Sequence, residues 1–138
     1  MVTVDAHLRA ALEKDLAPFD ITMGDYEMLA ILSEVPDNQM RMCDLAERLG
    51  LSPSGLTRRL DGLVKSRCVT RTPSAEDGRV TMALLTERGH TAMDAAAPTH
   101  LESVRARVID VLSPEQIAVL GDIFTAIGNA LGRPPALA

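Results

Sequence analysis

The chain has 138 residues, of which 46% are apolar, and its 14 basic and 19 acidic side chains give a net charge of −5. This length suits one domain or one compact subunit of an oligomer, and no apolar run approaches the ~18 residues that a membrane helix needs. The N-terminus lacks a secretion pattern and two cysteines are too few for a disulfide framework, so we expect a cytoplasmic protein with no membrane partner. The acidic balance argues at first against a nucleic-acid ligand.

Apolar spacing and capping residues predict two helices in the first part of the chain. Apolar side chains three or four positions apart line a first helix, which ends before Pro18. They are Val4, Leu8, Ala11, Leu12 and Leu16. Thr22 and Asp25 form a capping pair for a second helix, from Met23 to about Glu34, which Pro36 stops.

Two shorter helices follow, joined by a turn that contains glycine. The first runs from about Cys43 to Leu49, and Gly50 can end it in the left-handed conformation. Ser52 and Pro53 then supply the N-cap and the first-turn proline of a helix that reaches about Ser66.

Strand-forming residues and turn signals predict a β-hairpin next. The runs Val69–Pro73 and Val80–Leu85 flank a connection that contains Asp77-Gly78, a dipeptide typical of hairpins. Two short helices joined by such a turn and followed by a hairpin are the parts of a winged helix-turn-helix.

The last part of the chain is predicted to be helical again. Thr86 and Glu87 start a long helix to about Val111, in which we expect a kink or break at Pro98. Ser113 caps a final helix. Its apolar face consists of Ile117, Leu120, Ile123, Phe124, Ile127 and Leu131. The predicted fold class is therefore mainly α with a small β-hairpin wing.

The net charge hides an uneven distribution along the chain. Residues 1–40 carry 2 basic and 8 acidic side chains, residues 41–90 carry 9 and 6, and residues 91–138 carry 3 and 5. The net charges of these segments are −6, +3 and −2. A basic middle between acidic ends is typical of a polyanion-binding lobe on a scaffold, although an ordinary solvated surface also accounts for nine like charges.

The helix that follows Ser52 presents polar groups opposite its apolar face. At about 100° per residue, the polar side consists of Ser54, Thr57, Arg58, Asp61 and Lys65. Such groups contact base edges and phosphates in a major groove, and a helix N-terminus, here with Ser52 and Ser54, favours a phosphate. Arg59 flanks the core and suits a contact with the DNA backbone. Taken singly, these side chains also fit a plain solvated helix surface.

The predicted hairpin adds a second candidate contact with DNA. Arg79 beside its turn can enter a narrow, electronegative minor groove. Asp77 cannot favour DNA by charge, and we expect it to orient Arg79 or Arg71 through a hydrogen bond. The predicted DNA-binding residues are Ser52, Ser54, Thr57, Arg58, Arg59, Lys65, Arg71, Asp77 and Arg79.

Several motifs together match a known family pattern. They are Leu51-Ser52-Pro53-Ser54, Leu60, Leu63, Val69 with Arg71, Asp77-Gly78-Arg79 and Leu85-Thr86-Glu87-Arg88-Gly89. With them, the chain from Asp20 to the last helix resembles the MarR family of bacterial transcriptional regulators. The motif that joins the hairpin to the following helix is the most specific.

This resemblance implies a homodimeric regulator on a pseudo-palindromic operator in double-stranded DNA. A single MarR-type domain over 1–138 would contain dimerisation helices in 1–20 and 112–138, a winged helix-turn-helix lobe in 22–88 and a connecting helix in 87–111. Many members of the family bind a small phenolic or anionic effector that weakens DNA binding, which implies a repressor released by a ligand. We expect such a ligand to shift two recognition helices from the ~34 Å spacing of one DNA turn.

Two features depart from the family pattern. Arg67 stands where the family usually has glycine, so either the turn differs or Arg67 bears strain of about 1 kcal/mol. The first helix also starts later than is usual, which shortens the expected dimer contact.

Other functions have weaker support. No catalytic triad or phosphate loop is present and the three histidines lack the spacing of a metal site, so we expect no enzyme, no cofactor and no metal. Cys43 and Cys68 are interpreted as small buried hydrophobes rather than redox sensors. The alternative is a winged-helix protein-interaction module that does not bind DNA, which would have no need for both Arg58 and Arg79 on groove-facing surfaces.

Overall fold

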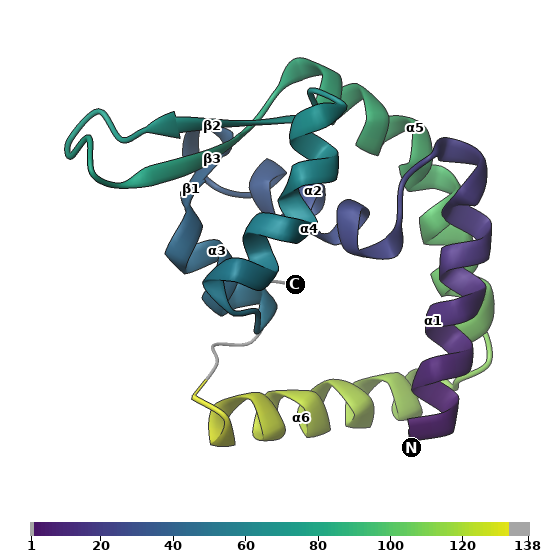
Figure 1. Ribbon diagram of the computed structural model, residues 1–138. Coiled ribbons are helices and arrows are strands. Elements are labelled where there is room, and N and C mark those ends of the chain that lie inside the picture. The colour runs from purple at the N-terminus through teal and green to yellow at the C-terminus, as the bar shows by residue number, and fades with distance from the viewer. Residues whose placement is uncertain (1, 133–138) are drawn as a thin grey trace. The chain divides into compact units, whose positions relative to one another are not determined.

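A computed structural model describes residues 2–132, and the chain divides into two compact units, residues 1–100 and 101–138. The elements in chain order (Figure 1) are α1 (Val2–Leu16), η1 (Ala17–Phe19), α2 (Met23–Ser33), η2 (Pro36–Asn38), β1 (Gln39–Arg41), α3 (Met42–Leu49), α4 (Pro53–Lys65), β2 (Val69–Pro73), β3 (Thr81–Leu85), α5 (Glu87–Val104), η3 (Arg105–Ile109) and α6 (Pro114–Ala130). In the described part of the chain, every helix is too short or too polar to cross a membrane. The predicted fold class, mainly α with a small winged sheet, is confirmed.

The predicted helix starts are confirmed, because the capping side chains make the expected bonds. Thr22 Oγ1 accepts a hydrogen bond from the Asp25 amide at 3.0 Å, and the Asp25 carboxylate accepts one from the Thr22 amide at 2.9 Å. Ser52 Oγ accepts from the Gly55 amide at 3.1 Å, and α6 opens with the same reciprocal box as α2. A cap of this kind contributes about 1 kcal/mol, because it satisfies amides that a helix start leaves without partners.

A cluster of buried aliphatic side chains joins α2, α3, α4 and the sheet. Its largest members are Met28, Leu29, Leu32, Leu45, Leu56, Leu60, Leu63, Val69 and Leu85. Full burial of one such side chain contributes about 1.5–3 kcal/mol. The same core therefore holds both α4 and the hairpin in place.

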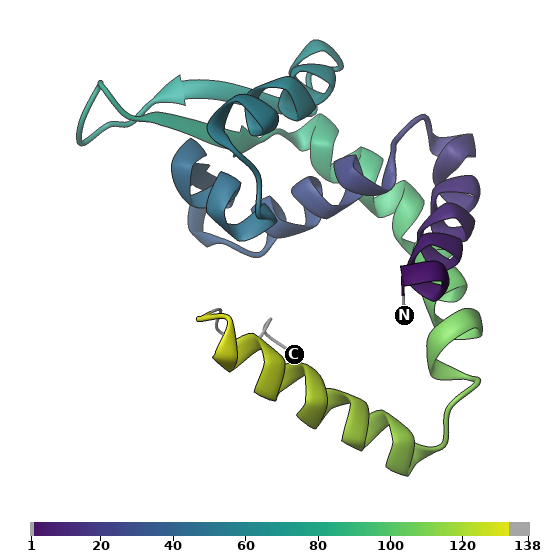
Figure 2. The same cartoon turned by 60° about the horizontal axis from the view of Figure 1, so that its bottom comes forward.

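The hairpin belongs to a three-stranded antiparallel sheet with strand order β1-β3-β2. Val69 pairs with Leu85 and Pro73 with Thr81, and the loop beyond them projects away from the helices as a wing (Figure 2). Strand β3 begins at Thr81 rather than at the predicted Val80. Strand β1 is absent from the sequence prediction, because three residues are too few to show an alternating pattern and only pairing with β3 defines them.

The turn after α4 keeps a left-handed backbone although it lacks glycine. Arg67 has φ = 63°. The Cys68 amide bonds to the Leu63 carbonyl at 2.9 Å and the Arg67 amide to the Val64 carbonyl at 3.0 Å, which is the Schellman arrangement. The turn therefore has the left-handed conformation that suits glycine at this position, and Arg67 bears the strain of an L-residue at positive φ.

Arg67→Gly is expected to raise the free energy of unfolding by up to about 1 kcal/mol, because glycine adopts positive φ without steric cost. The greater entropy of glycine in the unfolded chain offsets part of this gain. Urea denaturation measures the change, with Arg67→Ala as the control, since alanine removes the guanidinium and keeps the strain. Equal gains in both variants would contradict the strain argument.

Of the two outcomes predicted at Pro98, a break is wrong because α5 is continuous there, and a kink stays a prediction. Helical structure continues from Glu87 to Val104, and the wider π-type turns of η3 follow, with the Asp110 amide bonded to the Arg105 carbonyl at 2.8 Å. Proline removes one amide donor. Because the turns on both sides of Pro98 remain helical, this single loss does not end the helix.

An aromatic contact joins α2 to α5. The rings of Tyr26 and His100 have centroids 4.3 Å apart. Burial lowers the pKa of His100 from its usual 6.5. Burial, together with the negative charge of Asp94, raises the pKa of Tyr26.

The lowered pKa of His100 predicts that the folded protein loses stability in mild acid. The unfolded chain protonates His100 at its ordinary pKa of ~6.5, whereas the folded chain protonates it only at lower pH. The stability that depends on a neutral His100 is therefore fully present above pH ~6.5, the pKa in the unfolded chain. It is lost as the pH falls through the lower pKa of His100 in the folded chain. Thermal unfolding at pH 7.5 and 5.5 is expected to show a larger loss in the wild type than in His100→Gln. Equal losses would assign the acid sensitivity to other groups.

In the second unit, α6 exposes its apolar face. The following side chains on it are between 36% and 68% exposed: Ile117, Val119, Ile123, Phe124, Ile127 and Leu131. No residue of α6 is buried. Contiguous exposed apolar surface of this kind marks an interaction site.

Candidate nucleic-acid interface

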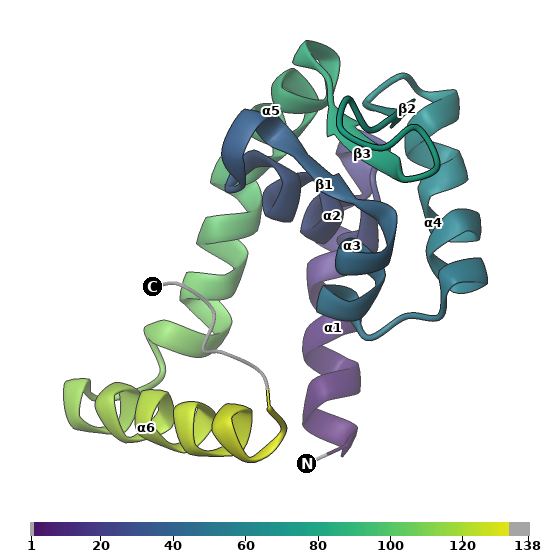
Figure 3. The same ribbon diagram turned by 90° about the vertical axis from the view of Figure 1, so that its left-hand side faces the viewer.

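Helix α4 lies on the surface of the first unit and leaves one whole side open (Figure 3). It buries Leu56, Leu60 and Leu63 against the core. The opposite side exposes the five predicted residues Ser54, Thr57, Arg58, Asp61 and Lys65. The predicted division of this helix into a buried and an exposed face is confirmed.

The middle of the exposed side of α4 carries cations that no neighbour neutralises. Within the described residues, Arg58 and Lys65 have no hydrogen-bond or ion-pair partner. At the helix N-terminus, the Ser52 hydroxyl accepts a hydrogen bond from the Gly55 amide and lies 3.3 Å from the Ser54 hydroxyl. Pro53 has no amide hydrogen, so the Ser54 amide is the donor left for a ligand.

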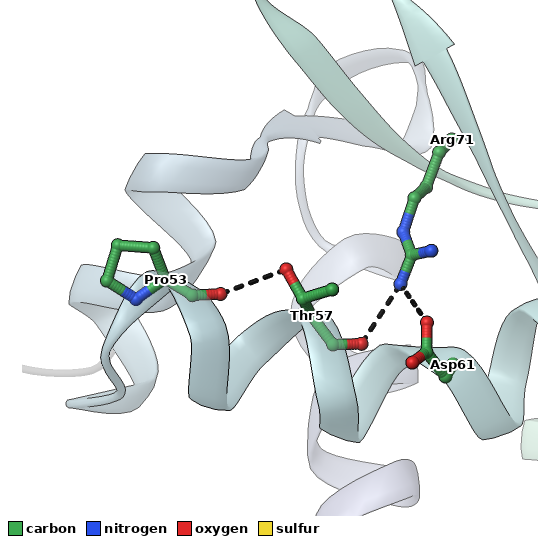
Figure 4. Close-up of polar contacts among 4 residues, drawn as sticks. All are labelled: Pro53, Thr57, Asp61 and Arg71. Carbon is green, nitrogen blue, oxygen red and sulfur yellow. Dashed lines mark hydrogen bonds and ion pairs between the residues drawn. The ribbon is translucent and has the colours of Figure 1, made fainter.

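The wing is tied to one flank of α4 by Arg71, which projects from β2 (Figure 4). Its Nη2 donates to the Thr57 carbonyl at 3.0 Å and to the Asp61 carboxylate at 2.6 Å. The Thr57 hydroxyl donates in turn to the Pro53 carbonyl at 3.0 Å. The sequence places Asp61 on the polar side of α4, but its pairing with Arg71 was not predicted, because nothing in the sequence shows which cation lies beside it.

Asp77 forms a hydrogen bond with Arg79, one of its two predicted partners, but with the main-chain amide and not with the guanidinium. Asp77 Oδ1 accepts from the main-chain amide of Arg79 at 3.0 Å, and its carbonyl accepts from the Val80 amide at 2.9 Å. An aspartate favours this local turn two residues before the amide that it binds. Arg71 pairs with Asp61 instead, because strand pairing brings β2 beside α4.

A hollow of about 380 Å³ lies between α3, α4 and the start of β3. It is lined by Met42, Cys43, Pro53, Leu56, Thr57, Arg79, Val80 and Thr81. The structure thus places Arg79 of the wing and Thr57 of α4, which are far apart in the sequence, around the same hollow.

Of the two thiols, Cys68 is buried as predicted, but Cys43 is exposed, contrary to the prediction. Cys43 lies about 200° around α3 from Leu45, on its solvent side. Within residues 2–132, no three side chains of the metal-binding types lie together as a metal site.

Arg59 occupies the other flank of α4. Its guanidinium lies over Gly24 in the first turn of α2, where an added Cβ would come within 3.3 Å of Arg59 Cζ. Arg59 therefore packs beside the core, as its position on the helix predicts, while its side chain remains exposed.

The motif Leu85-Thr86-Glu87-Arg88-Gly89, which follows the wing, makes contacts with the turn after α4 that the sequence does not reveal. Thr86 Oγ1 donates to the Arg67 carbonyl at 2.7 Å and to the Cys68 carbonyl at 3.0 Å, and accepts from the Gly89 amide at 3.0 Å. A Cβ on Gly89 would overlap the Cys68 carbonyl oxygen and lie 2.5 Å from Leu85 Cδ1. This motif locks the start of α5 onto the turn that ends α4.

Comparison with known proteins gives consistent matches over most of the chain. A sequence model of the MarR family matches residues 19–80. AbsC, a MarR family transcriptional regulator from Streptomyces coelicolor, is 39% identical with a TM-score of 0.89, over 94% of this chain and 88% of AbsC. Sco3205, a MarR family regulator from the same organism solved in complex with DNA, is 30% identical with a TM-score of 0.89, over 94% and 82%.

A curated relative agrees with these structures. The transcriptional repressor YetL of Bacillus subtilis (strain 168) is 26% identical over 125 residues, which cover 88% of this chain and 74% of YetL. With the winged fold, the exposed polar side of α4 and the match to AbsC along nearly the whole length, the chain belongs to the MarR family of transcriptional regulators, a family of regulators rather than enzymes.

Proposed function

We propose that this protein binds double-stranded DNA sequence-specifically and regulates transcription in the cytoplasm, as a repressor. The observation that carries the proposal is the exposed side of α4, where Arg58 and Lys65 have no partner among the described residues. A helix side with two unpaired cations and a free N-terminal amide suits a polyanion. The DNA complex of Sco3205 and the role of YetL as a transcriptional repressor support the same function.

Each predicted residue has a proposed role. Arg58 and Thr57 meet base edges in the major groove, and because the Thr57 hydroxyl already donates to Pro53, it offers DNA an acceptor and a methyl group. Arg79 enters the adjacent minor groove. Phosphates are contacted by Ser52, Ser54, Arg59 and Lys65. Arg71 and Asp77 act by holding the wing in position.

The proposal is tested by gel shift of the DNA that flanks the protein's own coding region, at two salt concentrations. We expect a discrete complex that weakens steeply with salt, because binding releases counterions from the phosphates. An absence of binding at both concentrations would favour the protein-interaction module instead.

We propose that two copies bind together, through residues 1–20 and 112–138. Support comes from the apolar surface that each helix leaves open in one chain: Val4 of α1 is 70% exposed and Phe124 of α6 is 65% exposed. A pseudo-palindromic operator follows from a two-fold dimer with one α4 per subunit.

Phe124→Glu is expected to convert the dimer into monomers at micromolar concentration, because it places a charge in the apolar interface. Sedimentation equilibrium measures the mass. Asp122→Ala, on the opposite side of α6, is the matched control and should remain dimeric. A wild-type protein that sediments as a monomer would refute the dimer.

A small phenolic or anionic effector, as many members of the family bind, is proposed to release the DNA by changing the distance between the two recognition helices from ~34 Å. Small-angle scattering with and without a compound that abolishes the gel shift tests this mechanism. An unchanged scattering profile with lost DNA affinity would refute it.

A further inference from the structure

The ion pair between the wing and α4 stands out on the proposed DNA-binding surface. Arg71 Nη2 lies 2.6 Å from Asp61 Oδ1 and 3.0 Å from the Thr57 carbonyl oxygen (Figure 4). The Asp61 side chain is 60% exposed, whereas that of Arg71 is 30% exposed. The carboxylate therefore lies at the surface, with the guanidinium partly beneath it.

The position of Asp61 runs against the proposed function of its helix. It is the one carboxylate among the residues of α4, and it lies on the same side as Arg58 and Lys65. A carboxylate in this position repels the phosphates of any DNA, whatever its sequence. Its net effect depends on Arg71, whose charge it cancels.

The geometry of Arg71 indicates that its ion pair with Asp61 contributes little to folding stability. One nitrogen makes both bonds to α4, and its Nε is buried without a hydrogen-bond partner among the described residues. A half-exposed pair of this kind adds little to folding stability, since solvent screens it. What the pair does achieve is to hold β2 against α4 without leaving a free cation there.

We infer that Asp61 is a specificity-determining residue for DNA binding. It positions the wing through Arg71 and withholds the Arg71 charge from phosphates, so that this part of the surface adds nothing to binding at random sequences. The inference rests on the proposed DNA binding, and it makes Arg71 a positioning residue rather than a phosphate contact.

Asp61→Asn separates charge from geometry, because asparagine keeps the acceptor oxygen for Arg71 and removes the negative charge. The probes are a random-sequence duplex and the fragment from the protein's own promoter, between 50 and 200 mM salt. We expect Asp61→Asn to bind the random duplex about fivefold more tightly per subunit, with a log–log salt slope steeper by about 0.9 per subunit. The ratio of promoter affinity to random affinity should fall.

Two further variants are expected to differ from Asp61→Asn in their affinity for the random duplex. Arg71→Gln leaves Asp61 uncancelled, so random-duplex affinity should fall. The double variant Asp61→Asn/Arg71→Gln restores the charge balance, so its affinity for the random duplex and its salt slope should return to the wild-type values while promoter affinity stays reduced. Glu102→Gln in α5 removes the same charge outside the winged lobe and the proposed dimer helices, and is the matched control.

The outcomes separate this inference from the proposed function. If the wild type binds neither duplex, the proposed DNA binding fails and the inference with it. If the wild type binds but Asp61→Asn behaves like Glu102→Gln, the inference alone is overturned. Parallel losses of melting temperature and of affinity for both duplexes, with an unchanged salt slope, would also overturn it, because they would show a purely structural pair.

Discussion

Gly89→Ala is expected to lower the free energy of unfolding by about 3 kcal/mol, one of the largest effects of a single methyl group in this chain. The added Cβ would overlap the carbonyl oxygen of Cys68, which is main chain and cannot rotate away. Thr86 holds that carbonyl from the other side through its hydroxyl and its amide. The first turn of α5 must therefore move away from the end of α4.

Urea denaturation monitored by circular dichroism measures this loss. The matched control is Gly62→Ala in α4, where an added Cβ would meet nothing within 4 Å. There the better helix propensity of alanine should stabilise the protein by up to about 1 kcal/mol. A stability for Gly89→Ala equal to the wild type would show that α5 adjusts freely, and the proposed lock on the α4 turn would be wrong.

Arg58→Ala/Arg79→Ala is expected to weaken binding to the promoter fragment at least about 30-fold per subunit, since two guanidinium contacts worth about 1–3 kcal/mol each total at least about 2 kcal/mol. The two single variants should differ in kind. Arg79→Ala should weaken binding to all sequences and flatten the salt dependence by about one phosphate equivalent. Arg58→Ala should relax the base preference at one position of each half-site.

Fluorescence anisotropy with labelled duplexes measures these affinities. Arg9→Ala/Lys14→Ala, which removes two exposed cations from α1, is the control with the same change of net charge. It should cost far less than the double variant on the winged lobe. Promoter binding by Arg58→Ala/Arg79→Ala at wild-type strength would defeat the assignment of these residues to DNA.

Local signals in the sequence predict most helix boundaries correctly. The starts of α2, α4 and α6 follow from Thr22, Ser52 and Ser113, because a capping hydroxyl binds amides only two or three residues away. Gly50 ends α3 in the left-handed conformation for a similarly local reason. The exposed side of α4 follows from the helical repeat alone.

Features that depend on partners distant in the chain escape such prediction. Strand β1 exists because β3 pairs with it, and the charge of Asp61 is cancelled because Arg71 of β2 reaches it. Cys43 was expected to be buried, yet packing of α3 through Leu45 leaves it in solvent. For β1 and the Asp61–Arg71 pair, a residue far along the chain decides the outcome, whereas Cys43 faces solvent because of its position on α3 relative to Leu45.

The sequence by itself determined the main helices, the hairpin and the basic segment at residues 41–90. All three depend on residues a few positions apart or on composition. The tertiary structure alone decided which charges remain available: Arg71 is cancelled by Asp61, whereas Arg58 and Arg79 have no side-chain partner among the described residues. Ion pairing depends on distances of a few ångströms between side chains, and only the packing of β2 and β3 against α4 sets those distances.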